Sequence, residues 1–124
     1  MTLKTILVVD DEPFIVKVVQ DIFKEEGYKV ITALSGQEAL EKLKKMRVDL
    51  ILLDIMMPGM DGWDTCAKIK SNKKTENIPI VFLTAKTDPV SKSMGRLASS
   101  DYITKPFDMK DLKKRIDSVI RASK

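Results

Sequence analysis

The chain has 124 residues, 44% of them hydrophobic and 32% charged, which is typical of one globular domain with a buried core. Its apolar runs are too short to span a membrane, and without any histidine it cannot hold His-ligated zinc or a Ser-His-Asp triad. The net charge of +4 comes from scattered lysine and arginine residues without a recognition motif, so we expect no direct contact with nucleic acid.

Five short apolar runs alternate with amphipathic stretches, and this pattern predicts five βα units around a parallel sheet. The runs comprise residues 6–9, 28–33, 50–53, 80–83 and 102–103. Three of them are continuous and rich in branched side chains, as in parallel strands that are covered on both faces. The second run contains Lys29 and Thr32 and therefore suits a more exposed strand.

The amphipathic stretches predict five helices, most of which begin at a recognisable capping signal. These signals are Asp11-Glu12-Pro13, Ser35-Gly36-Gln37-Glu38, Asp61, Asp88-Pro89 and Asp108. Apolar residues at helical spacing define the inward face of each helix. They include Ile15, Val18, Val19, Ile22 and Phe23 in the first helix, Ala39, Leu40 and Leu43 in the second, Cys66 and Ile69 in the third, Val90, Met94 and Leu97 in the fourth, and Leu112, Ile116, Val119 and Ile120 in the last.

Basic residues gather in two of these helical stretches. The usual explanation of such a cluster is a solvated helix face, and the absence of interleaved aromatic residues favours it here over a nucleic-acid contact. The clusters consist of Lys42, Lys44, Lys45 and Arg47, and of Lys110, Lys113, Lys114 and Arg115.

Polar residues follow four of the five predicted strands. In open α/β sheets, ligands bind at the carboxyl ends of the strands, which lie together at one edge of the sheet. We therefore expect carboxylates, a hydroxyl and an ammonium to converge at that edge. The residues concerned are Asp10, Asp11 and Glu12 after the first strand, Asp54 after the third, Thr84 and Ala85 after the fourth, and Thr104, Lys105 and Pro106 after the fifth.

The chemistry of this set points to phosphoryl transfer assisted by a hard cation. Like charges repel at close range, so the carboxylates of Asp10, Asp11 and Asp54 require a positive partner, and oxygen ligands favour Mg²⁺. One aspartate is then available as a nucleophile toward phosphorus. Lys105 supplies further positive charge, and the Thr84 hydroxyl can donate a hydrogen bond to a phosphoryl oxygen.

Together, these motifs resemble the CheY-like receiver domains of two-component response regulators. The motifs are Asp10-Asp11, the segment 52–62 (LLDIMMPGMDG), Thr84-Ala85 and Lys105-Pro106-Phe107. They occur in the family's order and at its usual spacing, over essentially the whole chain. The resemblance implies an α/β fold of the flavodoxin-like, doubly wound type, with a five-stranded parallel sheet of order 2-1-3-4-5 and five helices.

The resemblance also implies the roles of the acidic residues. Asp54 is the expected phosphoacceptor. Mg²⁺, with Mn²⁺ as an alternative, is expected to bind Asp11, Asp54 and the backbone carbonyl of Met56 directly, and Asp10 through a water molecule.

Phosphorylation is expected to be sensed by residues on the last two strands. Thr84, Ala85 and Lys105 would contact the phosphoryl group, and the peptide bond before Pro106 would be cis. Thr84 would then move toward the phosphoryl group while Tyr102 turns inward.

A signalling role follows from the same resemblance. The expected phosphoryl donor is a sensor histidine kinase acting in trans, and the expected output is a downstream protein that binds the fourth helix, fifth strand and last helix, residues 88–121. No catalysis is expected beyond the domain's own phosphorylation and dephosphorylation. The single cysteine, Cys66, and the lack of a signal-like pattern in residues 1–4 fit a cytoplasmic protein without a membrane segment.

Alternatives exist for the whole chain and for single residues. Residues 1–124 are interpreted as one stand-alone domain, but a fragment of a longer regulator with a DNA-binding or enzymatic output would look the same. A haloacid-dehalogenase-type phosphatase would need a second aspartate two residues after the nucleophile, where this chain has Met56. Taken singly, Asp10 and Asp11 are equally suited to capping the first helix, and Lys105 to an ordinary surface position.

Overall fold

The computed structural model describes residues 3–85 and 101–122. Within them, five parallel strands form one sheet in the order β2-β1-β3-β4-β5, which confirms the predicted flavodoxin-like topology. The strands are β1 (Thr5–Val9), β2 (Lys29–Ala33), β3 (Leu50–Asp54), β4 (Ile80–Ala85) and β5 (Asp101–Lys105).

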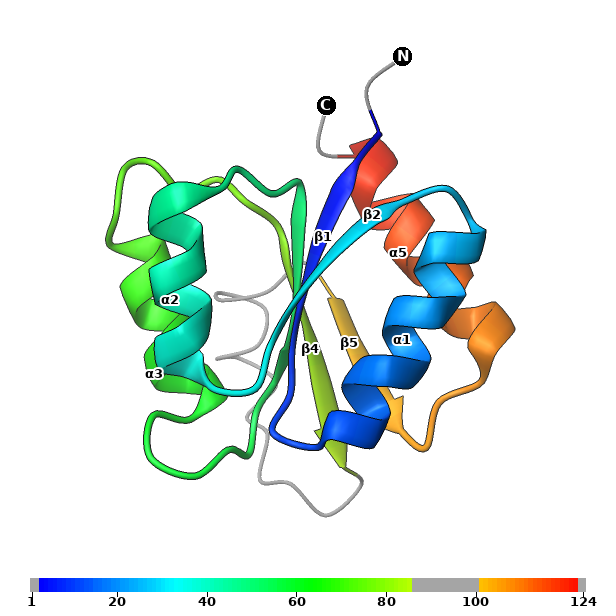
Figure 1. Ribbon diagram of the computed structural model, residues 1–124, viewed down its shortest axis with the longest axis horizontal. Helices are drawn as coiled ribbons and strands as arrows, with labels where there is room; N and C mark the ends of the chain where they lie inside the picture. Colours follow the sequence, from blue (N-terminus) through cyan, green and yellow to red (C-terminus); the bar gives the residue numbers. More distant parts are fainter. Residues whose placement is uncertain (1–2, 86–100, 123–124) are drawn as a thin grey trace.

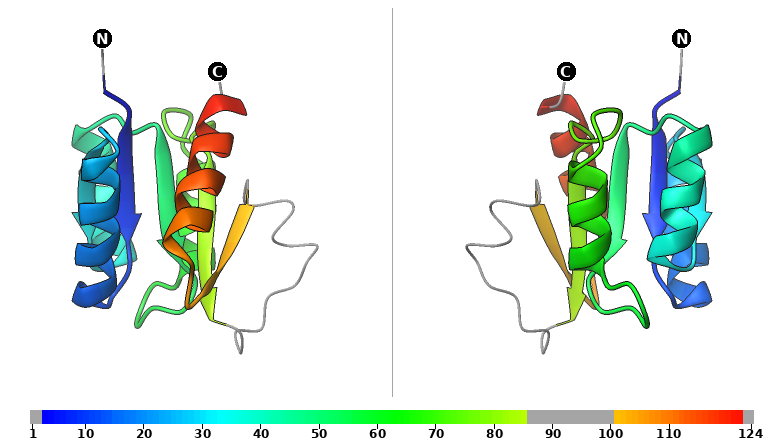
Figure 2. Two further views of the ribbon diagram at one scale, coloured as in Figure 1. Left: turned by 90° about the vertical axis from the view of Figure 1, so that its right-hand side faces the viewer. Right: turned by 90° about the vertical axis from the view of Figure 1, so that its left-hand side faces the viewer.

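Helices cover both faces of this sheet (Figure 1). One face is covered by α1 and α5 and the other by α2 and α3; Figure 1 shows the sheet nearly edge-on between these two layers, and Figure 2 views it through each layer in turn. The helices are α1 (Pro13–Glu25), α2 (Gly36–Lys45), α3 (Gly62–Lys70) and α5 (Met109–Ala122). The helix predicted after Asp88-Pro89 lies outside the described residues. Among the described helices, none has the length and apolar character needed to cross a bilayer.

The helices begin where their capping signals predict. Pro13 occupies the first turn of α1. The Ser35 hydroxyl accepts a hydrogen bond from the backbone N–H of Glu38 at 3.0 Å, and the Asp61 carboxylate accepts one from the N–H of Asp64 at 2.9 Å. These contacts satisfy backbone donors that the first turn of a helix otherwise leaves unpaired.

Alternating strand residues build two apolar clusters, one on each face of the sheet. Val8 and Leu52 belong to the cluster under α1 and α5. Val9 and Leu53, one position further along, belong to the cluster under α2 and α3. All four side chains are completely buried, as expected for central parallel strands that are covered on both faces.

The strands extend further than the hydrophobic pattern indicates. β3 ends at Asp54, β4 at Ala85 and β5 at Lys105, so the polar residues expected after the strands form their last positions. The backbone N–H of Ile55 even donates to the carbonyl of Leu83 at 3.1 Å, which continues the ladder past the acidic residue. Ladder hydrogen bonds join backbone atoms, so a polar side chain does not end the strand.

Candidate functional site

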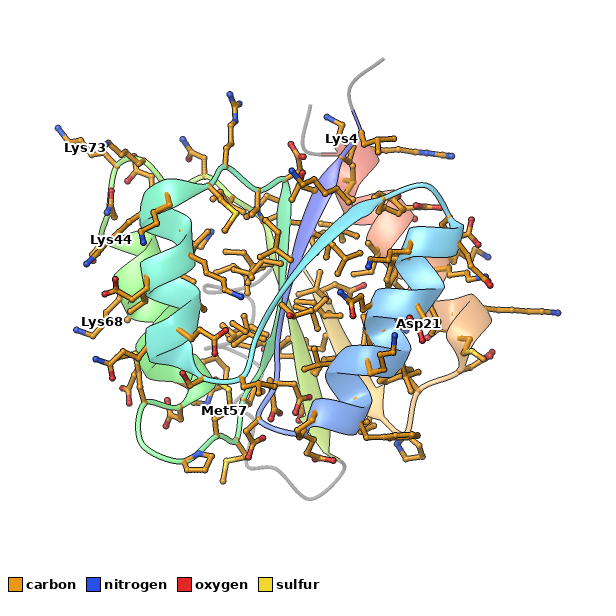
Figure 3. All side chains as sticks on the ribbon, viewed as in Figure 1. Lys4, Asp21, Lys44, Met57, Lys68 and Lys73 are labelled. Atoms are coloured by element: carbon orange, nitrogen blue, oxygen red, sulfur yellow. The ribbon has the colours of Figure 1, made fainter. Side chains whose placement is uncertain are left out.

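The strand register aligns the polar residues predicted for the site. β1 pairs with β3 in a register that brings Asp10 level with Asp54. β4 pairs with β5 so that Ala85 lies opposite Lys105. These residues therefore lie at the carboxyl edge of the sheet, the lower edge in Figure 3, where Met57 is labelled.

The ammonium group of Lys105 lies among three carboxylates. Its Nζ atom is 2.8 Å from Oδ2 of Asp10, 3.5 Å from Oδ1 of Asp54 and 3.8 Å from Oε1 of Glu12. The Asp10 side chain is completely buried, and Asp54 is only 4% exposed. Lys105 is thus an enclosed counter-ion rather than an ordinary surface lysine, and the Lys105–Pro106 peptide bond that follows it is cis.

This crowding raises the pKa of both Asp54 and Lys105. The shift favours the neutral form of Asp54 and the charged form of Lys105. Burial, together with the negative charges of Asp10 and Asp11, raises the pKa of Asp54 to about 7, although Lys105 opposes the shift. Burial alone would lower the pKa of Lys105, but the hydrogen bond to Asp10 and the neighbouring carboxylates outweigh it and raise that pKa. One ammonium therefore does not fully compensate the negative charge of the site.

The acidic residues of the β1–α1 connection form a compact set of oxygen donors. Carboxylate oxygens of Asp10, Asp11 and Glu12 lie within 4.8 Å of one another. The N–H of Glu12 also donates to Oδ1 of Asp10 at 3.0 Å, which fixes the turn. A set of carboxylates beside a carboxyl of raised pKa fits a hard divalent cation such as Mg²⁺. Glu12 was expected at this edge of the sheet from its place after the first strand, but no metal-binding or phosphoryl-binding role was predicted for it.

The connection from β3 to α3 is held close to the sheet by a glycine. The N–H of Gly62 donates to the carbonyl of Ile55 at 2.7 Å. A Cβ atom at position 62 would lie 2.6 Å from the Cα atom of Ile55, a distance that real side chains do not adopt. This close approach positions the backbone of the intervening loop, where the Met56 side chain is 56% exposed while that of Met57 is buried.

The residues predicted to form the switch lie on the last two strands. Thr84 is buried near the end of β4. The ring of Tyr102 stacks on that of Phe82 at 6.2 Å between centroids, and Phe82 in turn contacts Trp63 of α3 at 4.7 Å. Within the described residues, the Tyr102 hydroxyl is buried and has no hydrogen-bond partner. The side chain of Ala85 lies outside the described part of the structure.

Comparison with known proteins places the chain in a family. Residues 6–117 match the model of the response regulator receiver domain. The chain is 42% identical over 121 residues to the alkaline phosphatase synthesis transcriptional regulatory protein PhoP of Bacillus subtilis, covering 97% of this chain and 50% of PhoP.

Solved structures agree with this match. The Vibrio cholerae chemotaxis protein CheY4 superposes with a TM-score of 0.89 and 33% identity, covering 95% of this chain and 99% of CheY4. The response regulator TrrA of Thermotoga maritima, solved in complex with Mg²⁺ and a beryllium fluoride, gives a TM-score of 0.84 and 37% identity, covering 94% and 98% of the two chains.

The chain spans about half the length of the curated relatives it matches. Its family consists of signalling domains rather than catalysts, which excludes the haloacid-dehalogenase-type phosphatase considered from the sequence. The chain belongs to the response regulator receiver domain family of two-component signalling.

Proposed function

We propose that Asp54 is the phosphoacceptor of this receiver domain. The observation that carries this proposal is a nearly buried carboxylate at the carboxyl end of the central strand β3, with the ammonium of Lys105 at 3.5 Å and Asp10 beside it. A carboxylate oxygen of Asp54 attacks the phosphorus atom, and the bond from phosphorus to the donor nitrogen or oxygen breaks. Lys105 then faces the negative charge carried by the phosphoryl oxygens.

The cation proposed for this edge is Mg²⁺, with Mn²⁺ as a substitute. Asp11, Asp54 and the Met56 backbone carbonyl would hold it directly, and Asp10 through a water molecule. Support comes from the oxygen donors of the β1–α1 connection and from the raised pKa of Asp54, which reflects burial together with the negative charges of Asp10 and Asp11. When bound, the cation supplies positive charge to the phosphoryl oxygens. Because the pKa of Asp54 is about 7, this added charge also favours the ionised, nucleophilic form at neutral pH.

The proposed switch involves Thr84, Ala85, Lys105 and Tyr102. The backbone of Ala85 pairs with that of Lys105, and the Thr84 hydroxyl is one residue away from this pair. A phosphoryl group adds nearly two negative charges. The Thr84 hydroxyl would donate a hydrogen bond to its oxygens, and the Lys105 ammonium would offset its charge. Movement of Thr84 would then release space for the Tyr102 ring, whose hydroxyl is held by no described residue.

The proposed phosphoryl donor is a sensor histidine kinase acting in trans in the cytoplasm. We infer that residues 1–124 form one folded domain. The output is proposed to pass through the face that includes β5 and α5 to a downstream protein. Coverage of about half of PhoP supports a second candidate, in which the chain is the receiver part of a longer regulator with a DNA-binding output.

The acceptor assignment is tested by labelling with acetyl phosphate in the presence of Mg²⁺. We expect intact-mass analysis to show the gain of one phosphoryl group on the wild type and none on Asp54→Asn. Asp64→Asn, which changes an exposed acid at the start of α3, is the matched control and should label like the wild type. Undiminished labelling of Asp54→Asn would place the acceptor elsewhere.

A further inference from the structure

A groove crosses the edge of the sheet opposite Asp54, where the strands begin. It has a volume of about 670 Å³ and lies between the connections that lead into β3 and β4, with Val48, Ile78 and Pro79 among its apolar lining. A second hollow of about 360 Å³ adjoins it beside α2 and shares Lys44 and Lys74 with it. The volume of the larger groove is in the range of small-molecule binding sites.

The charged side chains that line this groove are almost all positive. Only one acidic residue, Asp49, is found among its described lining residues, and its carboxylate already accepts a hydrogen bond from the N–H of Thr5 at 2.7 Å. Lys68 continues the positive charge into the second hollow. Figure 3 shows Lys4 at the upper edge of the molecule and three other lysines on the flank with α2 and α3. The basic residues of the larger groove are Lys4, Lys44, Lys45, Arg47, Lys73 and Lys74.

The groove cations differ in ion pairing from basic residues elsewhere in the chain. Lys113 and Arg115, in the basic stretch of α5, form ion pairs with Glu26 at 2.7 Å and with Asp101 at 3.1 Å. Within the described residues, Lys44 pairs with the exposed Glu41 at 3.3 Å, and the other five basic groove residues have no carboxylate within 4.0 Å. Two of the four cations in the α5 cluster are therefore paired within the described residues, whereas the groove gathers mostly unpaired cations from three separate segments of the chain.

We propose that this basic groove binds a small anion carrying several phosphate groups in a row, as in an inorganic oligophosphate or the triphosphate of a nucleotide. Lysine ammonium groups bind phosphate as point charges, and several of them can engage successive phosphates. Within the described residues no aromatic side chain lines the groove, so base stacking is not expected to contribute. The run of phosphates is accordingly the recognised feature.

The test uses the full chain in EDTA, titrated separately with sodium tripolyphosphate and with ATP, and followed by calorimetry and amide chemical shifts. We expect one molecule to bind, with shifts in residues 44–49 and 73–79. Weaker binding at higher salt should follow, because phosphate contacts are electrostatic. Comparable binding of the two ligands, or tighter binding of tripolyphosphate, supports recognition of the phosphate run. Much tighter binding of ATP would show that the nucleoside is recognised, which contradicts the proposal.

A pair of charge-matched variants distinguishes the groove from overall charge. Arg47→Gln/Lys73→Gln removes two groove cations and should weaken tripolyphosphate binding by about tenfold or more. Lys110→Gln/Lys114→Gln removes two exposed, unpaired cations of α5 and should leave the affinity within about twofold. Circular dichroism melts of both variants should match the wild type, since all four side chains are exposed.

Three further results would overturn the proposal. Equal losses in the two double variants would mean that only net charge matters. Shifts centred on Asp54 and Lys105 would mean that the anion occupies the acceptor edge instead. Binding of duplex DNA that tripolyphosphate does not displace would assign the groove to nucleic acid.

Discussion

The Nζ atom of Lys105 lies 2.8 Å from Oδ2 of Asp10, a carboxylate that is completely buried. The same ammonium is 3.5 Å from Asp54, so one cation is shared between carboxylates at the carboxyl ends of the neighbouring strands β1 and β3. A phosphoryl group on Asp54 would compete with Asp10 for this ammonium. We therefore expect the balance between these two partners of Lys105 to affect both the stability of the domain and its response to phosphorylation.

Loss of this ion pair should destabilise the fold. Lys105→Met leaves Asp10 buried without a cation, and we expect the free energy of unfolding in urea to fall by about 3–5 kcal/mol at pH 7. The control is Lys113→Met, which removes the partly exposed partner of Glu26 and should change stability far less. Equal losses in the two variants would contradict a structural role for the Lys105–Asp10 pair.

Stability should depend on pH through Asp54. Its pKa is about 7 in the folded protein against an ordinary 3.8, so the folded state binds the proton more tightly. The resulting stabilisation is fully present below about pH 4 and is lost as the pH rises through about 7. In EDTA, the free energy of unfolding of the wild type should fall, relative to Asp54→Asn, by on the order of 3 kcal/mol across this range.

Urea titrations of both proteins at several pH values check this expectation. The difference between wild type and Asp54→Asn should grow up to about pH 7 and then level off. Parallel curves over the whole range would show that Asp54 titrates normally. Mg²⁺ at pH 8 should recover part of the lost stability in the wild type and less of it in Asp54→Asn.

The acidic residues of the β1–α1 connection should control metal affinity. Asp11→Ala removes a proposed direct ligand, and we expect calorimetry to show Mg²⁺ affinity reduced by about tenfold or more. Asp64→Ala, an exposed acid outside the donor cluster, should bind Mg²⁺ like the wild type. Unchanged affinity in Asp11→Ala would remove this residue from the metal site.

The Tyr102 ring should carry the response from Asp54 to α5. We expect Tyr102→Ala and Thr84→Ala to bind a beryllofluoride analogue while showing smaller amide shifts in residues 101–121 than the wild type. Tyr102→Phe should respond like the wild type, because the ring that stacks on Phe82 is kept and the hydroxyl has no described partner. Wild-type shifts confined to the carboxyl edge of the sheet would refute this output route.

The fold and most of the site followed from local patterns. Apolar runs predicted all five strands, and capping signals at Pro13, Ser35 and Asp61 predicted the starts of three helices. The strand ends were placed too early at Asp54 and Lys105, because hydrophobicity does not report backbone hydrogen bonding. Val16, buried on α1, was also missing from the predicted inward face.

The sequence by itself determined which chemical groups meet, because parallel strands bring their carboxyl ends to one edge and Asp10, Asp54 and Lys105 each come at such an end. Only the tertiary structure decided that Lys105 is closer to Asp10 than to Asp54, and that both carboxylates are buried. Those properties depend on which atoms surround a side chain, and the neighbours come from distant segments. For the same reason the sequence showed Lys44, Lys45 and Arg47 as a basic cluster but not the groove that they share with Lys4, Lys73 and Lys74. That grouping depends on distances between helices and loops, which no local pattern encodes.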